Sequence, residues 1–208
     1  MAMRRLIIAV MFLLAGFAAP LAAHAESGDE AVDFVNKFGA RAIDALTAPN
    51  LTDQELIARF RTLFEDGFDV AYIARSSLGR FWPRASEQER AEFVPLFESY
   101  IVQIYAVQFR QYSGERFDAQ SARPLPNGGF AVQSDVVRPD GPSTKMEWSV
   151  YPVDGKQKIR DIKIEGVSMI TTYRDQFANT ILQSNGELTG LIDALKQKTA
   201  QLAAESSG

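Results

Sequence analysis

The hydrophobic pattern of this chain changes its period twice, and this change limits the possible folds more than any other feature. Between residues 29 and 109, apolar side chains recur at spacings of three and four, which indicates amphipathic helices. From residue 116 to 164 the spacing becomes two, which is typical of strands with one buried face. From residue 168 to 202 the helical spacing returns. This order predicts an α+β protein, in which helices pack on one face of an antiparallel sheet.

Capping residues indicate where the first helices begin. Thr52 and Ser86 are each followed three residues later by glutamate, a capping box that pairs backbone N–H groups left free at a helix start. We therefore expect helices over residues 29–46, after Thr52, after Asp69 and after Ser86. The last of these is apolar around most of its circumference from Phe93 to residue 109, so it must be covered on several sides.

Turn sequences divide the strand-like region. Residues 126–129, 139–142 and 154–156 are rich in proline, glycine, asparagine and aspartate, which favour turns. Short connections between successive strands predict an antiparallel meander of four strands. The expected strands cover residues 117–125, 130–137, 145–151 and 158–164.

A strand passes directly into an aromatic helix near residue 166. Gly166 interrupts the strand pattern, and Ser168 can cap the helix that follows. Met169, Tyr173 and Phe177 then recur every four residues, so they share one helical face. Such a junction is a natural wall for an apolar pocket, and we interpret the chain as a lipid carrier.

The N-terminal segment has the pattern of a cleaved signal peptide. Basic Arg4 and Arg5 precede an apolar run over residues 6–14, and residues 23–25 form an A-x-A cleavage site. The alternative is a membrane anchor, but the apolar run is short for a bilayer and the cleavage site favours removal. We therefore expect residues 1–25 to be removed and residues 26–208 to form one domain in the periplasm.

Removal of this segment would limit the available chemistry. The only histidine, His24, would leave with it, and the chain has no cysteine. Ser-His-Asp catalysis, cysteine nucleophiles and zinc sites of the His/Cys type are then excluded, and no metal site is predicted. The remaining chain would carry 20 basic and 26 acidic residues, since only Arg4 and Arg5 are lost, and a net charge of −6 does not suit nucleic acid.

Two blocks of sequence resemble the MlaC/Ttg2D (toluene tolerance) family of periplasmic phospholipid-binding proteins. One block is Glu-Gly-Val-Ser at 165–168 with Tyr-Arg and Gln-Phe within 173–177, and the other is Leu-Gly-Arg-Phe-Trp at 78–82. The chain departs from the family at Pro83, where arginine is usual, and at Gln157, where tryptophan is usual. The resemblance nevertheless extends over nearly the whole chain after the signal peptide.

The resemblance carries expectations about fold and function. It implies a curved sheet of the NTF2-like kind, enclosed by six or seven helices around an apolar cavity, in a monomer. It implies phospholipid as cargo, no cofactor, and a role in outer-membrane lipid asymmetry. The implied partners are an inner-membrane ABC transporter complex with a tethered periplasmic domain and an outer-membrane lipoprotein–porin complex. A related branch is associated with hopanoid biosynthesis, so another lipid remains an alternative cargo.

Aromatic and branched aliphatic side chains are the candidate cavity wall, because apolar walls alone retain acyl chains. Tyrosine and tryptophan are favoured at the mouth, where their polar atoms can meet water. Arg80 and Arg84, beside Phe81 and Trp82, are candidates for docking partner proteins, since charges at a rim steer encounters. The candidate lipid-binding residues are Phe97, Ile101, Tyr105, Met146, Trp148, Val150, Val167, Ile170, Tyr173 and Phe177.

Other interpretations of the polar residues remain open. Asp161 and Glu165 could act as acid and base in an NTF2-like enzyme, although Glu165 falls on the polar face of its strand. We predict no catalytic residues. Arg174 could contact a lipid phosphate or form a salt bridge with Asp161 or Asp175. A third possibility is an adaptor or chaperone whose apolar groove holds protein segments.

Overall fold

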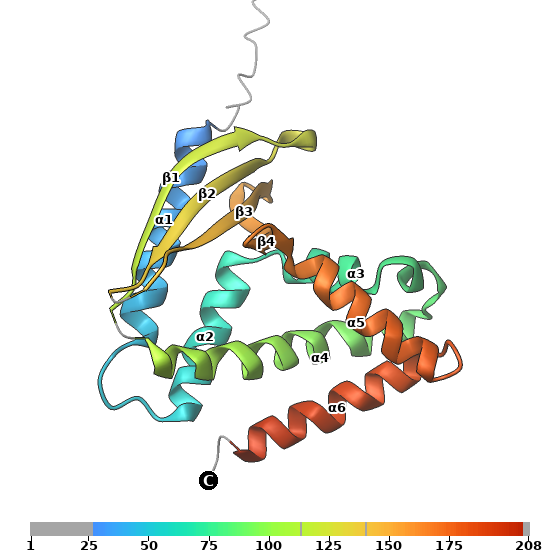
Figure 1. The fold of residues 1–208 in the computed structure, drawn as a ribbon. Helices are drawn as coiled ribbons and strands as arrows, with labels where there is room; N and C mark the ends of the chain where they lie inside the picture. The colour runs from blue at the N-terminus through green and yellow to red at the C-terminus, as the bar shows by residue number, and fades with distance from the viewer. Residues whose placement is uncertain (1–26, 113, 140, 206–208) are drawn as a thin grey trace, which may run out of the picture.

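The computed structural model describes residues 27–112, 114–139 and 141–205, and the predicted signal peptide lies outside them. In this part of the chain, a sheet with α1 along one side lies on a layer of helices (Figure 1). The α+β prediction is therefore confirmed. The α-helices are α1 (Gly28–Leu46), α2 (Asp53–Gly67), α3 (Val70–Leu78), α4 (Glu87–Ala106), α5 (Met169–Gln183) and α6 (Leu188–Glu205).

The sheet is an antiparallel meander, as predicted, in which every strand pairs with its neighbours in sequence. Register shifts interrupt the pairing of β1 with β2 and of β3 with β4, and such irregularities bend strands. The structure adds a fifth strand of two residues, in which Val167 pairs with Ile164. A strand this short has no measurable period, so the sequence predicted only four. The strands are β1 (Arg116–Pro124), β2 (Phe130–Val137), β3 (Thr144–Val153), β4 (Lys156–Ile164) and β5 (Val167–Ser168).

The helix starts follow the capping residues. Both predicted capping boxes are present, with Thr52 opening α2 and Ser86 opening α4. A third capping box, at Ser27, opens α1. Asp69 and Ser168 accept backbone N–H groups at the starts of α3 and α5. Local sequence chemistry therefore fixes where these helices begin.

Short 3-10 helices occur at places that periodicity did not predict. α4 ends at Ala106, and the chain continues as η2 (Val107–Gln111), although apolar spacing runs on to Phe109. η1 (Gly79–Arg84) follows α3, and η3 (Pro126–Gly128) joins β1 to β2. A 3-10 turn tightens the hydrogen bonding without changing which residues are apolar, so the sequence pattern does not reveal it.

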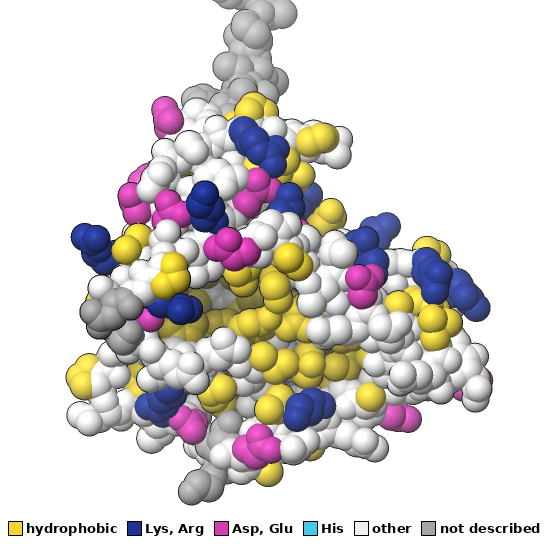
Figure 2. Space-filling model, in the orientation of Figure 1, with side chains coloured by type: hydrophobic (Ala, Val, Ile, Leu, Met, Phe, Trp, Pro, Cys, Tyr) yellow, Lys and Arg dark blue, Asp and Glu magenta, His cyan; other side chains and the backbone are white. Residues whose placement is uncertain are grey.

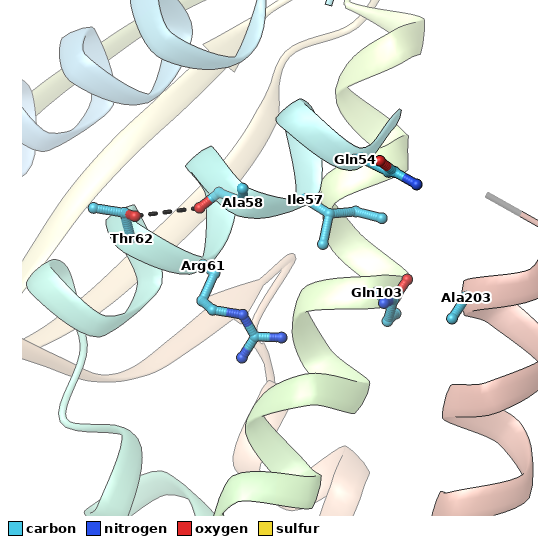
Figure 3. A pocket seen from close by; sticks show the side chains of 7 residues that line it. All are labelled: Gln54, Ile57, Ala58, Arg61, Thr62, Gln103 and Ala203. Carbon is cyan, nitrogen blue, oxygen red and sulfur yellow. Dashed lines mark hydrogen bonds between the residues drawn. The ribbon is translucent and has the colours of Figure 1, made fainter. Parts of the chain in front are cut away.

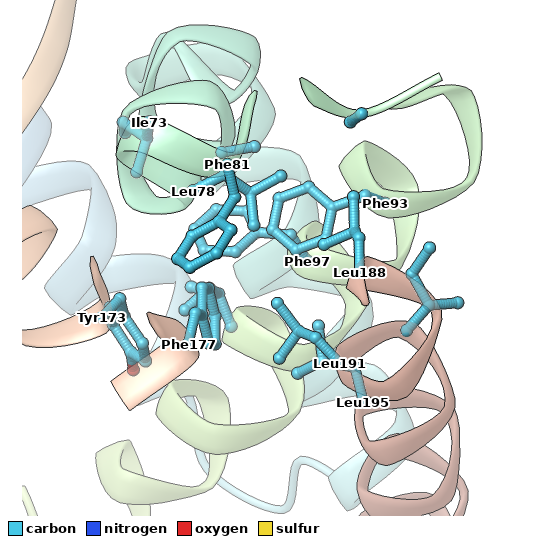
Figure 4. Packing of buried hydrophobic residues seen from close by; sticks show 14 of the residues in the cluster. Ile73, Leu78, Phe81, Phe93, Phe97, Tyr173, Phe177, Leu188, Leu191 and Leu195 are labelled. Atoms are coloured by element: carbon cyan, nitrogen blue, oxygen red, sulfur yellow. The ribbon is translucent and has the colours of Figure 1, made fainter. Parts of the chain in front are cut away.

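The buried residues form two separate apolar clusters. The helical cluster joins α3, η1, α4, α5 and α6, and Figure 4 shows its side chains packed against one another. The sheet cluster lies between the sheet and helices α1 and α2. Ile57 and Phe60 of α2, with Phe68 just after it, are only partly buried and pack against both clusters. We call these three residues the seam.

Candidate functional site

An apolar hollow opens where the sheet meets the helical layer. Figure 2 shows hydrophobic side chains gathered in this hollow, across the middle of one face, below the sheet and above α6. Large apolar side chains that remain partly exposed border the two clusters, among them Tyr105 and Met169 on the helical side and Met146 and Ile162 on the sheet side. Apolar surface gathered in a concavity is a typical site for an apolar ligand.

The structure distributes the predicted lipid-binding residues over two walls. Val167 belongs to neither wall, because it lies on the short edge strand β5 with 59% of its surface exposed. The sheet cluster contains Trp148 and Val150, with Met146 packed against it. The helical cluster contains Phe97, Ile101, Ile170, Tyr173 and Phe177, with Tyr105 packed against it.

Two of the predicted wall residues fill the helical core. The rings of Phe97 and Phe177 meet edge to face at 6.1 Å, and each also packs at 5.9 Å against Phe93. Figure 4 shows these side chains pointing toward one another. All three are almost fully buried, so their main role is packing between α4 and α5.

Three tyrosines lie where the helical cluster meets its surroundings. The Tyr173 hydroxyl donates a hydrogen bond to the Tyr105 hydroxyl at 3.0 Å, and the Tyr100 and Tyr173 rings pack edge to face at 6.3 Å. Burial raises the pKa of both Tyr173 and Tyr100, and the neighbouring Tyr105 adds to each shift. The hydroxyls of Tyr173 and Tyr100 therefore stay neutral, which suits a wall that meets hydrocarbon on one side and polar groups on the other.

Trp148 belongs to the interior of the sheet layer and not to a cavity mouth. Its indole N–H donates to the Ser134 hydroxyl at 2.8 Å, in a buried hydrogen bond. Its ring meets Phe38 and Phe117 edge-on at 6.4 and 5.6 Å. The expectation of a polar atom at the mouth therefore fits Tyr105 better than Trp148.

A pocket of about 490 Å³ lies beside the seam, between α2, α4 and the end of α6 (Figure 3). We call it the α2–α4 pocket. We did not predict this pocket from the sequence. The apolar residues on two faces of α2 could have indicated that a second surface of this helix is partly covered. Its lining comprises Gln54, Ile57, Ala58, Arg61, Thr62, Gln103 and Ala203.

A charged contact joins α2 to α4 at this pocket. The Arg61 guanidinium pairs with the Glu98 carboxylate and approaches the Ser99 hydroxyl at 3.4 Å. Burial raises the pKa of Glu98 above its ordinary value, although the Arg61 charge opposes the shift, and nearby Glu65 raises it further. The pocket therefore combines an apolar side with a partly buried ion pair.

The two carboxylates considered for catalysis hold the backbone in place. Asp161 accepts hydrogen bonds from the Ser168 hydroxyl at 2.6 Å and the Ile170 amide at 3.1 Å, and so supports the start of α5. Glu165 accepts the Lys145 amide at 2.6 Å. Both carboxylates therefore have structural partners in the backbone or beside it.

The arginines considered for binding have different surroundings. Arg174 donates to the Ser76 carbonyl at 3.0 Å, a contact that differs from both a phosphate contact and the expected salt bridge. Arg80 and Arg84 are exposed, and their guanidinium carbons lie 5.1 and 6.0 Å from the centre of the Phe81 ring. A shallow hollow of about 270 Å³ adjoins Phe81 and Arg84. Docking at this surface stays a prediction.

Two features common in other protein classes are missing from the described part of the chain. No helix in residues 27–112, 114–139 and 141–205 has the length and apolarity needed to span a bilayer. The same residues contain no group of three or more histidine, cysteine, aspartate or glutamate side chains placed to hold a metal ion.

The fold and the hollow define an α+β protein in which a bent antiparallel sheet and a helical layer face each other across apolar surface. The model of the MlaC protein family matches residues 36–197, most of the chain. The chain therefore belongs to the MlaC family, as the sequence blocks indicated.

Individual relatives agree with this assignment. The toluene tolerance protein ttg2D of Pseudomonas putida is 21% identical over 118 residues, which cover 57% of this chain and 55% of that protein. The intermembrane phospholipid transport system binding protein MlaC of Haemophilus influenzae is 23% identical over 137 residues, covering 64% of this chain and 63% of that protein. The matches thus span less than two thirds of these relatives.

A solved structure supports the fold. The chain is similar to the phospholipid-binding protein from Ralstonia solanacearum, whose structure holds a phospholipid, with a TM-score of 0.73 and 22% identity. The similarity covers 83% of this chain and 98% of that one. The arrangement of sheet and helices described above is therefore that of a known protein fold.

Proposed function

We propose that this protein binds a phospholipid by its acyl chains, in the apolar hollow between the sheet and the helical layer. The observation that carries the proposal is the hollow itself, bordered by two apolar clusters that share the seam residues Ile57, Phe60 and Phe68 at their boundary. Membership of the MlaC family, with relatives named for phospholipid transport and phospholipid binding, supports it.

Apolar contacts supply enough free energy for retention. Burial of a methylene group contributes about 0.8 kcal/mol, so two chains of about sixteen carbons contribute on the order of 20 kcal/mol before ordering costs. The tails can therefore be held without reactive groups, and the protein carries its lipid unchanged. This agrees with a family of carriers rather than enzymes.

The proposed function includes a cellular compartment and a route of lipid transfer. The carrier acts in the periplasm, reached through cleavage of the predicted signal peptide. It exchanges lipid between an outer-membrane lipoprotein–porin complex and an inner-membrane ABC transporter complex with a tethered periplasmic domain. Its exposed Arg80 and Arg84 contribute to docking on these partners. Transfer of lipid along this route maintains the lipid asymmetry of the outer membrane.

Native mass spectrometry of the purified protein tests the proposal. We expect an adduct of phospholipid mass, with extracted lipid identified by tandem mass spectrometry. A hopanoid in the extract would instead indicate the related branch, and competition by unfolded client proteins would indicate a chaperone. A protein that stays empty after incubation with phospholipid vesicles would contradict the carrier function.

A further inference from the structure

Three tyrosines lie together at the border of the helical cluster, and their hydroxyls hold more hydrogen-bond donors than they use. The Tyr173 O–H donates to the Tyr105 oxygen at 3.0 Å. The Tyr100 ring packs edge to face on the Tyr173 ring, with 6.3 Å between the ring centres. The O–H groups of Tyr100 and Tyr105 have no acceptor among the described residues. This place therefore offers two O–H donors to a ligand.

Both donors can be reached from outside the core. Tyr100 and Tyr105 are partly exposed side chains of α4 that pack against the helical cluster. The Tyr100 oxygen is not one of the fully buried side-chain oxygens that lack a partner, so it keeps access to its surroundings. Figure 4 shows Tyr173 at one side of the cluster, with its oxygen turned away from Phe93. The two free donors therefore lie at the surface of the helical wall.

A ligand made only of hydrocarbon would leave both donors without a partner. Acyl chains that fill the hollow displace water from its wall, and an O–H group that is covered without an acceptor is unfavourable. A ligand that brings two acceptors to the wall avoids this cost. In a diacyl phospholipid the two ester carbonyls are such acceptors, and they lie between the tails and the headgroup. The number and the place of the acceptors therefore match the two free hydroxyls.

On the basis of the proposed carrier function, we propose that the Tyr100 and Tyr105 hydroxyls donate hydrogen bonds to the ester carbonyls of a bound diacyl phospholipid. These contacts fix how deep the lipid lies, because the tails extend from the carbonyls toward the seam and the headgroup stays outside in water. The two tyrosines therefore select for the ester linkage and not for a headgroup. A dialkyl ether lipid has no carbonyls, leaves both donors unpaired and binds less tightly.

A competition between two lipids tests this inference. The purified, delipidated protein is incubated with vesicles that contain equal amounts of dioleoyl phosphatidylcholine and its diether analogue, in which a methylene group replaces each ester carbonyl. The bound lipids are then quantified by mass spectrometry. Because the headgroup and the chain length are the same, the ratio of the two bound lipids reports on the carbonyls. We expect about a tenfold preference for the ester lipid, since each of two neutral hydrogen bonds contributes a factor of about three or more.

Phenylalanine variants make the test specific, because they remove a hydroxyl and keep the ring. Tyr100→Phe should lower the ester preference about threefold. Tyr105→Phe alone would free the Tyr173 O–H, so the three tyrosines are also replaced together, and this triple variant should bring the bound ratio close to one. If the triple variant does not fold, Tyr100→Phe alone decides the test. The matched control is Tyr72→Phe at an exposed position on α3, which should keep the preference of the unaltered protein.

The outcomes separate this inference from the proposed function. A loaded protein with no preference for the ester lipid, or a preference that the phenylalanine variants retain, would overturn the role of the hydroxyls and leave the carrier function standing. An equal fall in the load of both lipids would also overturn it, because it would indicate that the hydroxyls serve packing alone. A protein that takes up neither lipid would overturn both.

Discussion

At the scale of single residues, one carboxylate ties four strands together. Glu147 on β3 accepts hydrogen bonds from Arg123 on β1 at 2.9 Å, Gln133 on β2 at 2.6 Å and Lys163 on β4 at 2.7 Å. Burial alone would raise the pKa of Glu147, but these donors outweigh it and lower the pKa below its ordinary value. Folding therefore favours the ionised form of Glu147. Its hydrogen bonds link the strands on the sheet face opposite Trp148, since neighbouring residues of a strand alternate between faces.

This network makes stability depend on pH. Because the folded pKa of Glu147 is lowered, its contribution is present above the unfolded value of about 4.5 and is lost as the pH falls through the folded value. We expect Glu147→Gln to lower the free energy of unfolding by about 1 kcal/mol at pH 7 and to have little effect at pH 3. Urea unfolding at both pH values measures this. Glu187→Gln, exposed before α6, is the control, and an equal loss at both pH values would contradict the explanation.

A charge at Tyr105 should empty the proposed lipid site. This side chain is only partly buried and packs at the border of the helical cluster, so Tyr105→Arg can place its charge toward the hollow without opening the core. We expect lipid load to fall about tenfold or more, because a charge beside hydrocarbon is unfavourable, while the circular dichroism spectrum is kept. Leu182→Arg adds the same charge at an exposed apolar position on α5 and should leave the load unchanged. An unchanged load in Tyr105→Arg would place the tails elsewhere.

At the scale of elements, close approach of α1 to the sheet depends on a glycine. A Cβ atom added at Gly39 would lie 2.6 Å from the Phe117 ring of β1, closer than packed atoms allow. Phe117 in turn packs edge-on against Trp148 at 5.6 Å, so the ring is held from its other side. The glycine in the middle of α1 is therefore required by packing and not by backbone conformation.

This contact gives a prediction that opposes helix propensity. Alanine favours helix by about 1 kcal/mol over glycine, yet we expect Gly39→Ala to lower the free energy of unfolding by about 1–3 kcal/mol, since overpacking displaces Phe117. Gly28→Ala, at the start of the same helix, is the matched control, because its nearest neighbour would lie at 3.4 Å. Thermal unfolding of both variants measures the difference. A Gly39→Ala protein as stable as the unaltered one would show that α1 can move away from β1.

The elements also show how far the sequence predicts the fold. Thr52, Ser86, Asp69 and Ser168 could be identified as helix caps because capping is a local interaction between a side chain and backbone amides a few residues away. The strand β5 and the 3-10 turns could not, because they depend on hydrogen bonds that apolar spacing does not record. The predicted turns at residues 126–129 and 154–156 likewise follow from local chemistry, whereas the bends of the sheet do not.

At the scale of the whole molecule, the proposed lipid site lies between two apolar clusters, and the separation of these clusters was not visible in the sequence. Phe97 and Tyr105 occur on the same apolar helix, yet one fills the helical core and the other remains partly exposed at its border. Periodicity reports that a side chain is apolar and does not report whether protein or ligand covers it. The same limit explains Val167, whose apolar character suggested a wall although it lies exposed on an edge strand.

Docking should depend on the charges of Arg80 and Arg84. We expect the double variant Arg80→Glu, Arg84→Glu to slow association with the proposed partner, the tethered domain of an inner-membrane complex, about tenfold at low salt, because rim charges act mainly on association rate. Lipid load should not change. Surface plasmon resonance at two salt concentrations measures the rate, and the same reversal at exposed Arg116 and Arg138 is the control. Equal effects of both pairs would indicate only general charge repulsion.

Photo-crosslinking with a lipid tail tests the central claim most directly. The protein is loaded with a phospholipid that carries a diazirine near the end of one acyl chain, irradiated, digested and sequenced by mass spectrometry. We predict adducts on the peptides that contain the seam residues Ile57, Phe60 and Phe68, and on the α4 peptide around Tyr105. Adducts confined to exposed surface, such as the β5 edge at Val167, would contradict a lipid held between the sheet and the helices.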